Sequence, residues 1–165
     1  MNMKKIFSVK TLTLAAITAA LYVVFTLLSN ALGLALGVFE FRLSEGLTIL
    51  PVFTPAAVPG LTVGCLLANL LVGGIPLDVA LGSAASLLGA LGTYLFREKK
   101  LLPYLCPIVS NTLIVSPVLY FAYGFGHEFG FVLFTLIFLA GEAGSVFLFG
   151  FLFRKALTPI RKFLK

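Results

Sequence analysis

Charged and amide side chains are scarce in this sequence, and several of them interrupt or border long apolar runs. Arg42 and Glu45 stand in the phrase Phe-Arg-Leu-Ser-Glu at residues 41–45, and Asn111 and Glu142 are each flanked by apolar residues. A charge near the centre of a bilayer costs roughly 2.5–3.5 kcal/mol on insertion scales, so such groups usually mark a ligand path or a binding site. Glu142 has no basic residue within one helical turn, so it is either protonated or supplied with a donor by another helix or by a ligand.

Purely structural roles compete with ligand binding at these positions. Arg42 and Glu45 are three residues apart, so one helical turn would place them on one face as an ion pair. Asp78 follows Gly-Gly-Ile-Pro and could simply cap a helix. A hydrogen bond between Asn111 and Glu142 could serve packing alone. We favour ligand contact for these groups, and Asn69, toward the outer end of an apolar run, is a further candidate.

The composition fixes the kind of element that must position these groups. Of the 165 residues, 60% are hydrophobic and 11% are charged, and the mean hydropathy is +1.11. Soluble domains are nearer 45–50% apolar, so the sequence predicts an integral membrane protein with one transmembrane domain over residues 1–165. The first apolar run is too long for a signal peptide, and we interpret it as a retained span.

Charges and Pro/Gly signals divide the chain into six apolar segments. A helix needs about 20 apolar residues to cross a bilayer, and the second segment, with about 11, must be a short or tilted helix shielded by its neighbours. The sequence therefore predicts an all-α fold, a compact bundle of six transmembrane helices. The segments are residues 11–36, 43–53, 55–72, 77–96, 101–123 and 129–153.

The basic residues predict the orientation. If both termini are cytoplasmic, every lysine and arginine except Arg42 faces the cytoplasm, as the positive-inside bias requires. Four or five spans would put a basic cluster on the wrong side. We therefore expect a multi-pass protein of the cell membrane, and the net charge of +6 does not indicate nucleic-acid binding. The carboxylates, apart from Glu98, gather in the outer half of the bundle.

Small residues form a stripe on the first span. Small side chains four residues apart let another helix approach closely, which is how helices associate in lipid. The stripe could pack within the bundle or form a docking face for a separate protein. Its members are Ala15, Ala16, Ala19 and Ala20.

Motifs for catalysis are missing from the sequence. It contains no Walker phosphate loop, no His-Glu-x-x-His and no Gly-x-Ser-x-Gly, and His127 reads as a solvated loop residue. Cys65 and Cys106 have no spacing for a metal site, and we interpret them as small buried hydrophobes. We expect a protein that is not an enzyme, with no metal and no cofactor.

The phrase at 41–45 continues to residue 60 as Gly-Leu-Thr-Ile-Leu-Pro-Val-Phe-Thr-Pro-Ala-Ala-Val-Pro-Gly. Together with residues 64–71, Asp78 with Gly82, residues 111–115 and the Gly-Glu pair at 141–142, this block resembles the QueT family of queuosine precursor transporters. The similarity extends over nearly the whole chain. Members of that family are substrate-binding S-components of energy-coupling factor (ECF) transporters.

The resemblance implies a six-helix S-component that captures a micronutrient outside the cell and works with a transmembrane coupling protein and two cytoplasmic ATPases. The implied ligand is a 7-deazaguanine queuosine precursor or queuine. Hydrogen-bonding chemistry would then assign Glu142 or Glu45 to the donor edge, Asn111 and Asn69 to carbonyl or ring nitrogens, and Asp78 or Glu40 to a cationic aminomethyl group. Phe41 and Tyr120 are candidates for stacking, and Arg42 could donate to the carbonyl. The alanine stripe would contact the coupling protein.

Two other hypotheses remain open at this point. The chain could be an S-component for another vitamin, such as riboflavin, thiamine or biotin. It could also be a small membrane scaffold or channel without a ligand, whose buried polar groups serve only helix packing. A scaffold should gain no thermal stability from any ligand, whereas a tight binder should gain several kcal/mol.

Overall fold

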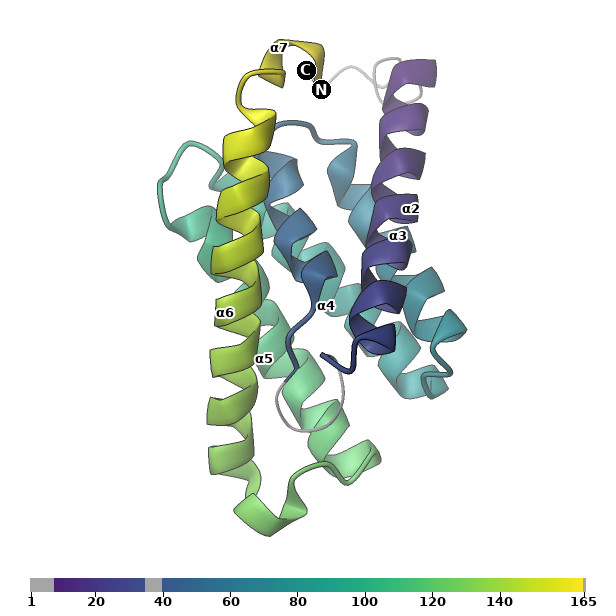
Figure 1. Ribbon diagram of the computed structural model, residues 1–165, viewed down its shortest axis with the longest axis vertical. Coiled ribbons are helices and arrows are strands. Elements are labelled where there is room, and N and C mark those ends of the chain that lie inside the picture. The colour runs from purple at the N-terminus through teal and green to yellow at the C-terminus, as the bar shows by residue number, and fades with distance from the viewer. Residues whose placement is uncertain (1–7, 35–39, 165) are drawn as a thin grey trace.

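The computed structural model describes residues 8–34 and 40–164, and every regular element in that part of the chain is helical. Each of the six predicted spans is a helix. The elements are α2 (Val9–Ala31), η1 (Leu43–Val52), α3 (Ala57–Leu71), α4 (Pro76–Leu95), α5 (Leu102–Ala122), η2 (His127–Phe129), α6 (Phe131–Leu157) and α7 (Arg161–Leu164). Figure 1 shows the long helices side by side along one axis.

Four of the helices, α2, α4, α5 and α6, are long and apolar enough to cross a membrane. The other two apolar segments are shorter, with 15 residues in α3 and 10 in η1. The predicted shortness of the second helix is therefore confirmed, and α3 is shorter than its predicted span as well. The first span is also shorter than predicted: α2 ends at Ala31 rather than at residue 36, and a turn follows at residues 32–34. Gly33 in this turn has φ 71°, a left-handed conformation that commonly ends helices.

The last long helix runs past its predicted end. We expected the span to stop at Phe153, but α6 continues through Arg154 and Lys155 to Leu157. Cations are favourable in the last turn of a helix because they face the negative end of its dipole. Long basic side chains also extend from the end of a span to the membrane surface, so charge does not end this helix.

The short second helix lies at the centre of the bundle. It is a 3₁₀-helix, and its residues from Ser44 to Val52 are all buried. A 3₁₀-helix rises about 2.0 Å per residue, so ten residues extend about 20 Å, further than the same residues would as an α-helix. It contacts α2, α3, α4, α5 and α6, which together shield its backbone from lipid. The expectation of a shielded short helix is met by this arrangement.

The start of α2 and the end of α6 lie at the same end of the bundle (Figure 1). Nη1 of Arg154, near the end of α6, donates a hydrogen bond to the carbonyl oxygen of Lys100 at 3.4 Å, so the loop before α5 lies there too. We call this the basic end. It carries the described basic residues of the chain except Arg42, which lies toward the opposite end.

The alanine stripe is divided between two faces of α2. Ala19 is buried, Ala15 is half-buried, and Ala16 and Ala20 are exposed. A methyl group added to Gly60 of α3 would lie 2.7 Å from the carbonyl oxygen of Ala15. One added to Gly64 would lie 3.0 Å from the Cα atom of Ala19. Ala15 and Ala19 therefore pack inside the bundle against α3, while Ala16 and Ala20 face outward.

This close approach gives a prediction about stability. Gly60→Ala should lower the thermal stability of the purified chain in detergent, by about 1–3 kcal/mol, because its methyl group would meet backbone and Cβ atoms of α2. Gly144→Ala is the control. There the nearest atom is the edge of the Phe41 ring at 3.2 Å, which can shift, and the change should be small or stabilising. Equal losses for both variants would contradict the close α2–α3 contact.

Candidate functional site

The segment that carries Glu40 and Arg42 is bonded to two long helices at the point where η1 begins. The backbone N–H of Arg42 donates to Oγ of Ser145 on α6 at 3.1 Å, and that of Leu43 donates to Oγ of Ser29 on α2 at 2.9 Å. The first N–H groups of a helix have no partner within it, so these two serines act as caps supplied by neighbouring helices. They fix where the Arg42 side chain enters the bundle.

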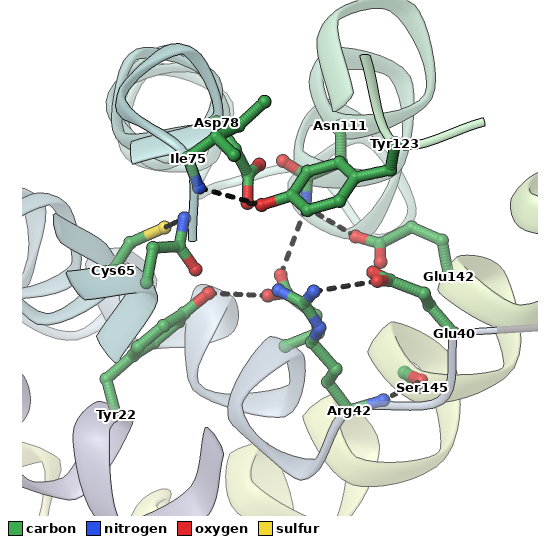
Figure 2. Close-up of polar contacts among 12 residues, drawn as sticks. Tyr22, Glu40, Arg42, Cys65, Ile75, Asp78, Asn111, Tyr123, Glu142 and Ser145 are labelled. Atoms are coloured by element: carbon green, nitrogen blue, oxygen red, sulfur yellow. Dashed lines mark hydrogen bonds and ion pairs between the residues drawn. The ribbon is translucent and has the colours of Figure 1, made fainter. Parts of the chain in front are cut away.

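A chain of hydrogen bonds crosses the bundle from α2 to α6. The hydroxyl of Tyr22 donates to Oε1 of Glu45 at 2.6 Å. Nδ2 of Asn111 on α5 donates to Oε2 of Glu45 at 3.1 Å and to Oε1 of Glu142 at 2.6 Å (Figure 2). All four side chains are buried. The donor that Glu142 requires therefore comes from another helix, and one amide holds two carboxylates together.

A second polar group lies where α4 begins and α5 ends. The hydroxyl of Tyr123 accepts from the backbone N–H of Ile75 at 3.0 Å and donates to Oδ2 of Asp78 at 3.1 Å (Figure 2). Asp78 lies in the first turn of α4, where the helix dipole favours a negative charge. Nearby, Nδ2 of Asn69 on α3 contacts Sγ of Cys65 at 3.7 Å.

These groups enclose one cavity between the helices, which we call the polar chamber. About 20 Å³ of it is open to the centre of a water-sized molecule, enough for about one water. A ligand the size of a purine requires the side chains to move apart. The lining residues are Tyr22, Glu40, Arg42, Glu45, Cys65, Asn69, Asp78, Gly82, Ser86, Asn111, Val115, Phe138 and Glu142.

Charge in the polar chamber is unbalanced. It holds four carboxylates, those of Glu40, Glu45, Asp78 and Glu142, and one guanidinium, that of Arg42. Arg42 forms an ion pair with Glu40 at 2.8 Å rather than with Glu45. Burial raises the pKa of the Glu40 carboxyl, and the adjacent guanidinium opposes that rise. Each of the remaining three carboxylates accepts a hydrogen bond, but none of them forms an ion pair among the described residues.

Arg42 also retains an unused donor. Its Nε atom is buried and has no hydrogen-bond partner among the described residues. A buried donor without an acceptor costs about 1–3 kcal/mol, and such an atom in a native protein calls for an explanation. An acceptor oxygen brought into the polar chamber by a ligand would satisfy it.

The family model for the QueT transporter matches residues 12–159, nearly the whole chain. This chain belongs to the QueT transporter family. No curated protein and no solved structure matches it. Together with its apolar helices, membership in the QueT family makes the chain a multi-pass membrane protein of a transporter family.

Six of the eight candidate site residues of this QueT family member line the polar chamber, and two lie elsewhere. Phe41 contacts the ring of Phe149 on α6, with centroids 5.3 Å apart. Tyr120 belongs to an aromatic group near η2, where its backbone oxygen lies 2.7 Å from Nε2 of His127. Neither ring lines the chamber, so neither is placed for stacking on a ligand there. The six that line it are Arg42, Glu45, Asn69, Asp78, Asn111 and Glu142.

The structure adds Tyr22 to the lining, which the sequence analysis missed. It is the one tyrosine within α2, and only 1% of its surface is exposed. A buried tyrosine usually has a hydrogen-bond partner, so its presence in an otherwise apolar span was a usable signal. Tyr123, which follows α5 and is half-buried, was not predicted either; it orients Asp78 rather than lining the chamber.

Proposed function

We propose that this chain is the substrate-binding S-component of an ECF transporter that imports a 7-deazaguanine queuosine precursor. One observation carries the proposal: carboxylates, two amides and an arginine from separate segments line one chamber in a largely apolar bundle. Buried polar groups in a membrane protein are expensive and usually functional. Membership in the QueT transporter family supports the same ligand class.

The chamber offers partners for each edge of a deazaguanine. A guanine-like edge presents adjacent N–H donors, which one carboxylate can accept as a pair, and Glu142 or Glu45 fills that role. The carbonyl of the ligand requires a donor, and the unused Nε of Arg42 is available beside the amide of Asn111. Asn69 supplies a second amide for a ring nitrogen.

The excess of carboxylates favours a ligand that carries an amine. Asp78 and Glu40 line the chamber on different elements, and an aminomethyl group between them would supply a missing positive charge. Asp78 is held in place by the hydroxyl of Tyr123 and by its position in the first turn of α4. Glu40 already pairs with Arg42, so a neutral deazaguanine would leave Asp78 without a cation.

Binding exchanges internal hydrogen bonds for ligand contacts. The bond from Tyr22 to Glu45 and the bond from Asn111 to Glu142 occupy the acceptors that a ligand would use. Because the chamber admits about one water, these pairs must separate as the ligand enters. The same bonds keep the buried carboxylates satisfied before binding, which limits the cost of an unliganded chamber.

Transport requires partners in this proposal. The basic end faces the cytoplasm, in accordance with the positive-inside rule, and the polar chamber lies toward the outside. A coupling protein and two ATPases supply the energy, since the sequence has no phosphate-binding loop. The outward-facing half of the alanine stripe, Ala16 and Ala20, contacts the coupling protein.

Ligand-induced stabilisation of the purified subunit tests the proposal. The amine-bearing 7-aminomethyl-7-deazaguanine should raise the unfolding temperature, since ligand at about 1,000 times Kd adds roughly 4 kcal/mol. It should bind about 10–100-fold more tightly than unsubstituted 7-deazaguanine, because a charged hydrogen bond contributes about 1.5–3 kcal/mol. Equal affinity for the two would contradict the cation site. Stabilisation by riboflavin, thiamine or biotin instead would identify another vitamin, and no shift with any ligand would support the scaffold.

A further inference from the structure

An open groove lies on the lipid-facing side of the basic end, between the start of α5 and the last turns of α6. It has a volume of about 600 Å³ and is separate from the polar chamber, with which it shares no residue. α5 packs beside α6, so the groove runs between neighbouring helices (Figure 1). The groove therefore calls for a separate account.

The chemistry of the groove changes along its length. Phe147, Phe151 and Lys155 are four residues apart, so they share one face of α6, and this face passes from aromatic to basic toward the helix end. Leu101 completes the apolar wall. Phe147, Phe151 and Leu101 are 40%, 61% and 63% exposed, so in a membrane these side chains meet acyl chains.

Basic side chains from two segments line the groove at its edge nearest the basic end. Arg154 and Lys155 come from α6, and Lys100 comes from the loop before α5. Arg154 is held in place by its bond to the Lys100 carbonyl at 3.4 Å and by the Tyr104 ring, whose centroid lies 5.7 Å from its guanidinium carbon. Among the described residues the one ion pair is that of Arg42 with Glu40, so these three cations have no carboxylate partner.

Orientation by the positive-inside rule accounts for basic residues at this end, but it places no requirement on a groove between them. An apolar floor with a basic, hydrogen-bonding edge is complementary to a molecule with an acyl chain and an anionic phosphate head. Arginine binds phosphate oxygens through two parallel donors, and a held guanidinium loses less freedom on doing so. We infer that this groove, Lys100–Tyr104 with Phe147–Thr158, is a binding site for an anionic phospholipid of the surrounding membrane.

Lipid adducts on the purified chain test the inference by native mass spectrometry. Phosphatidylglycerol should be retained in preference to phosphatidylcholine with the same acyl chains. In the double variant Arg154→Gln/Lys155→Gln, the ratio of phosphatidylglycerol to phosphatidylcholine retained should fall by about 10- to 30-fold. This is the change expected for the loss of two basic residues. The matched control Lys99→Gln/Lys162→Gln removes the same charge from exposed positions at the same end that do not line the groove, and it should retain the preference.

Two further experiments distinguish a lipid site from a site for anions in general. Phe151→Ala should weaken retention of both lipids, because it removes part of the apolar wall, and inorganic phosphate should not displace phosphatidylglycerol. The inference is overturned if the two double variants lose the preference equally, since the effect would then be diffuse charge. It is also overturned if phosphate displaces the lipid, or if Arg154→Gln/Lys155→Gln blocks assembly with a coupling protein while lipid preference is unchanged.

Discussion

Glu142→Gln should lower the affinity for the deazaguanine ligand by at least 100-fold. A carboxylate accepts two adjacent N–H groups of a guanine edge, whereas a carboxamide offers one acceptor oxygen and turns an N–H₂ toward the donors of the ligand. Each charged hydrogen bond that is lost contributes about 1.5–3 kcal/mol, and 1.4 kcal/mol corresponds to a factor of ten. Isothermal titration of the purified subunit measures the change.

The fold should survive this substitution. In the unliganded chain Glu142 accepts one hydrogen bond, from Nδ2 of Asn111, and the oxygen of a glutamine can still accept it. Glu128→Gln is the matched control, because Glu128 is an exposed carboxylate shortly before α6 that does not line the polar chamber. The Glu128→Gln variant should bind the deazaguanine ligand as tightly as the unchanged chain. If Glu142→Gln binds as tightly as Glu128→Gln, Glu142 is not a ligand contact and its bond with Asn111 serves packing alone.

Ala16→Trp combined with Ala20→Trp should abolish uptake and leave ligand binding by the isolated subunit unchanged. Both alanines are exposed on α2 and point away from the α3 contact, so an indole there meets lipid in the isolated subunit. In a complex, the same ring would prevent close approach of a partner helix, which depends on small side chains. Uptake by cells that carry the complete transporter and titration of the purified subunit measure the two properties.

Matched substitutions distinguish docking from general damage. Leu113→Trp places the same ring on α5, where Leu113 is 69% exposed, and uptake should continue. Ala19→Trp should instead destabilise the subunit itself, because Ala19 is buried against Gly64. Unimpaired uptake by the Ala16/Ala20 variant would contradict the docking assignment without affecting the assignment of the polar chamber.

Hydropathy and charge sufficed to predict most of the architecture. The six helical segments follow from apolar runs broken by Pro, Gly and charge, because the bilayer requires continuous apolar helices. Asn111 and Glu142 were identified because each interrupts such a run. Tyr22 escaped notice because its partner Glu45 is 23 residues away, and no local spacing connects the two.

The ion pair of Arg42 with Glu45, considered as the alternative to ligand contact, presupposed a helix that does not extend to Arg42. Arg42 and Glu45 were considered as a pair on one helical face, but Arg42 precedes η1 in extended backbone, with φ −106° and ψ 127°. Its side chain therefore leaves in another direction and pairs with Glu40, two residues back. Phe41 also precedes η1, and its ring contacts Phe149 of α6 and does not line the polar chamber.

The sequence by itself determined that the chain forms apolar helices, which residues carry polar chemistry and which end is basic. These properties depend on the free energy of transferring each segment from water to lipid, which is set by the residues of that segment alone. Only the tertiary structure decided that Tyr22, Glu45, Asn111 and Glu142 meet, and that Ala15 and Ala19 face inward while Ala16 and Ala20 face outward. Rotation of each helix about its axis sets those contacts, and it is fixed by packing against neighbours that lie far away in the sequence.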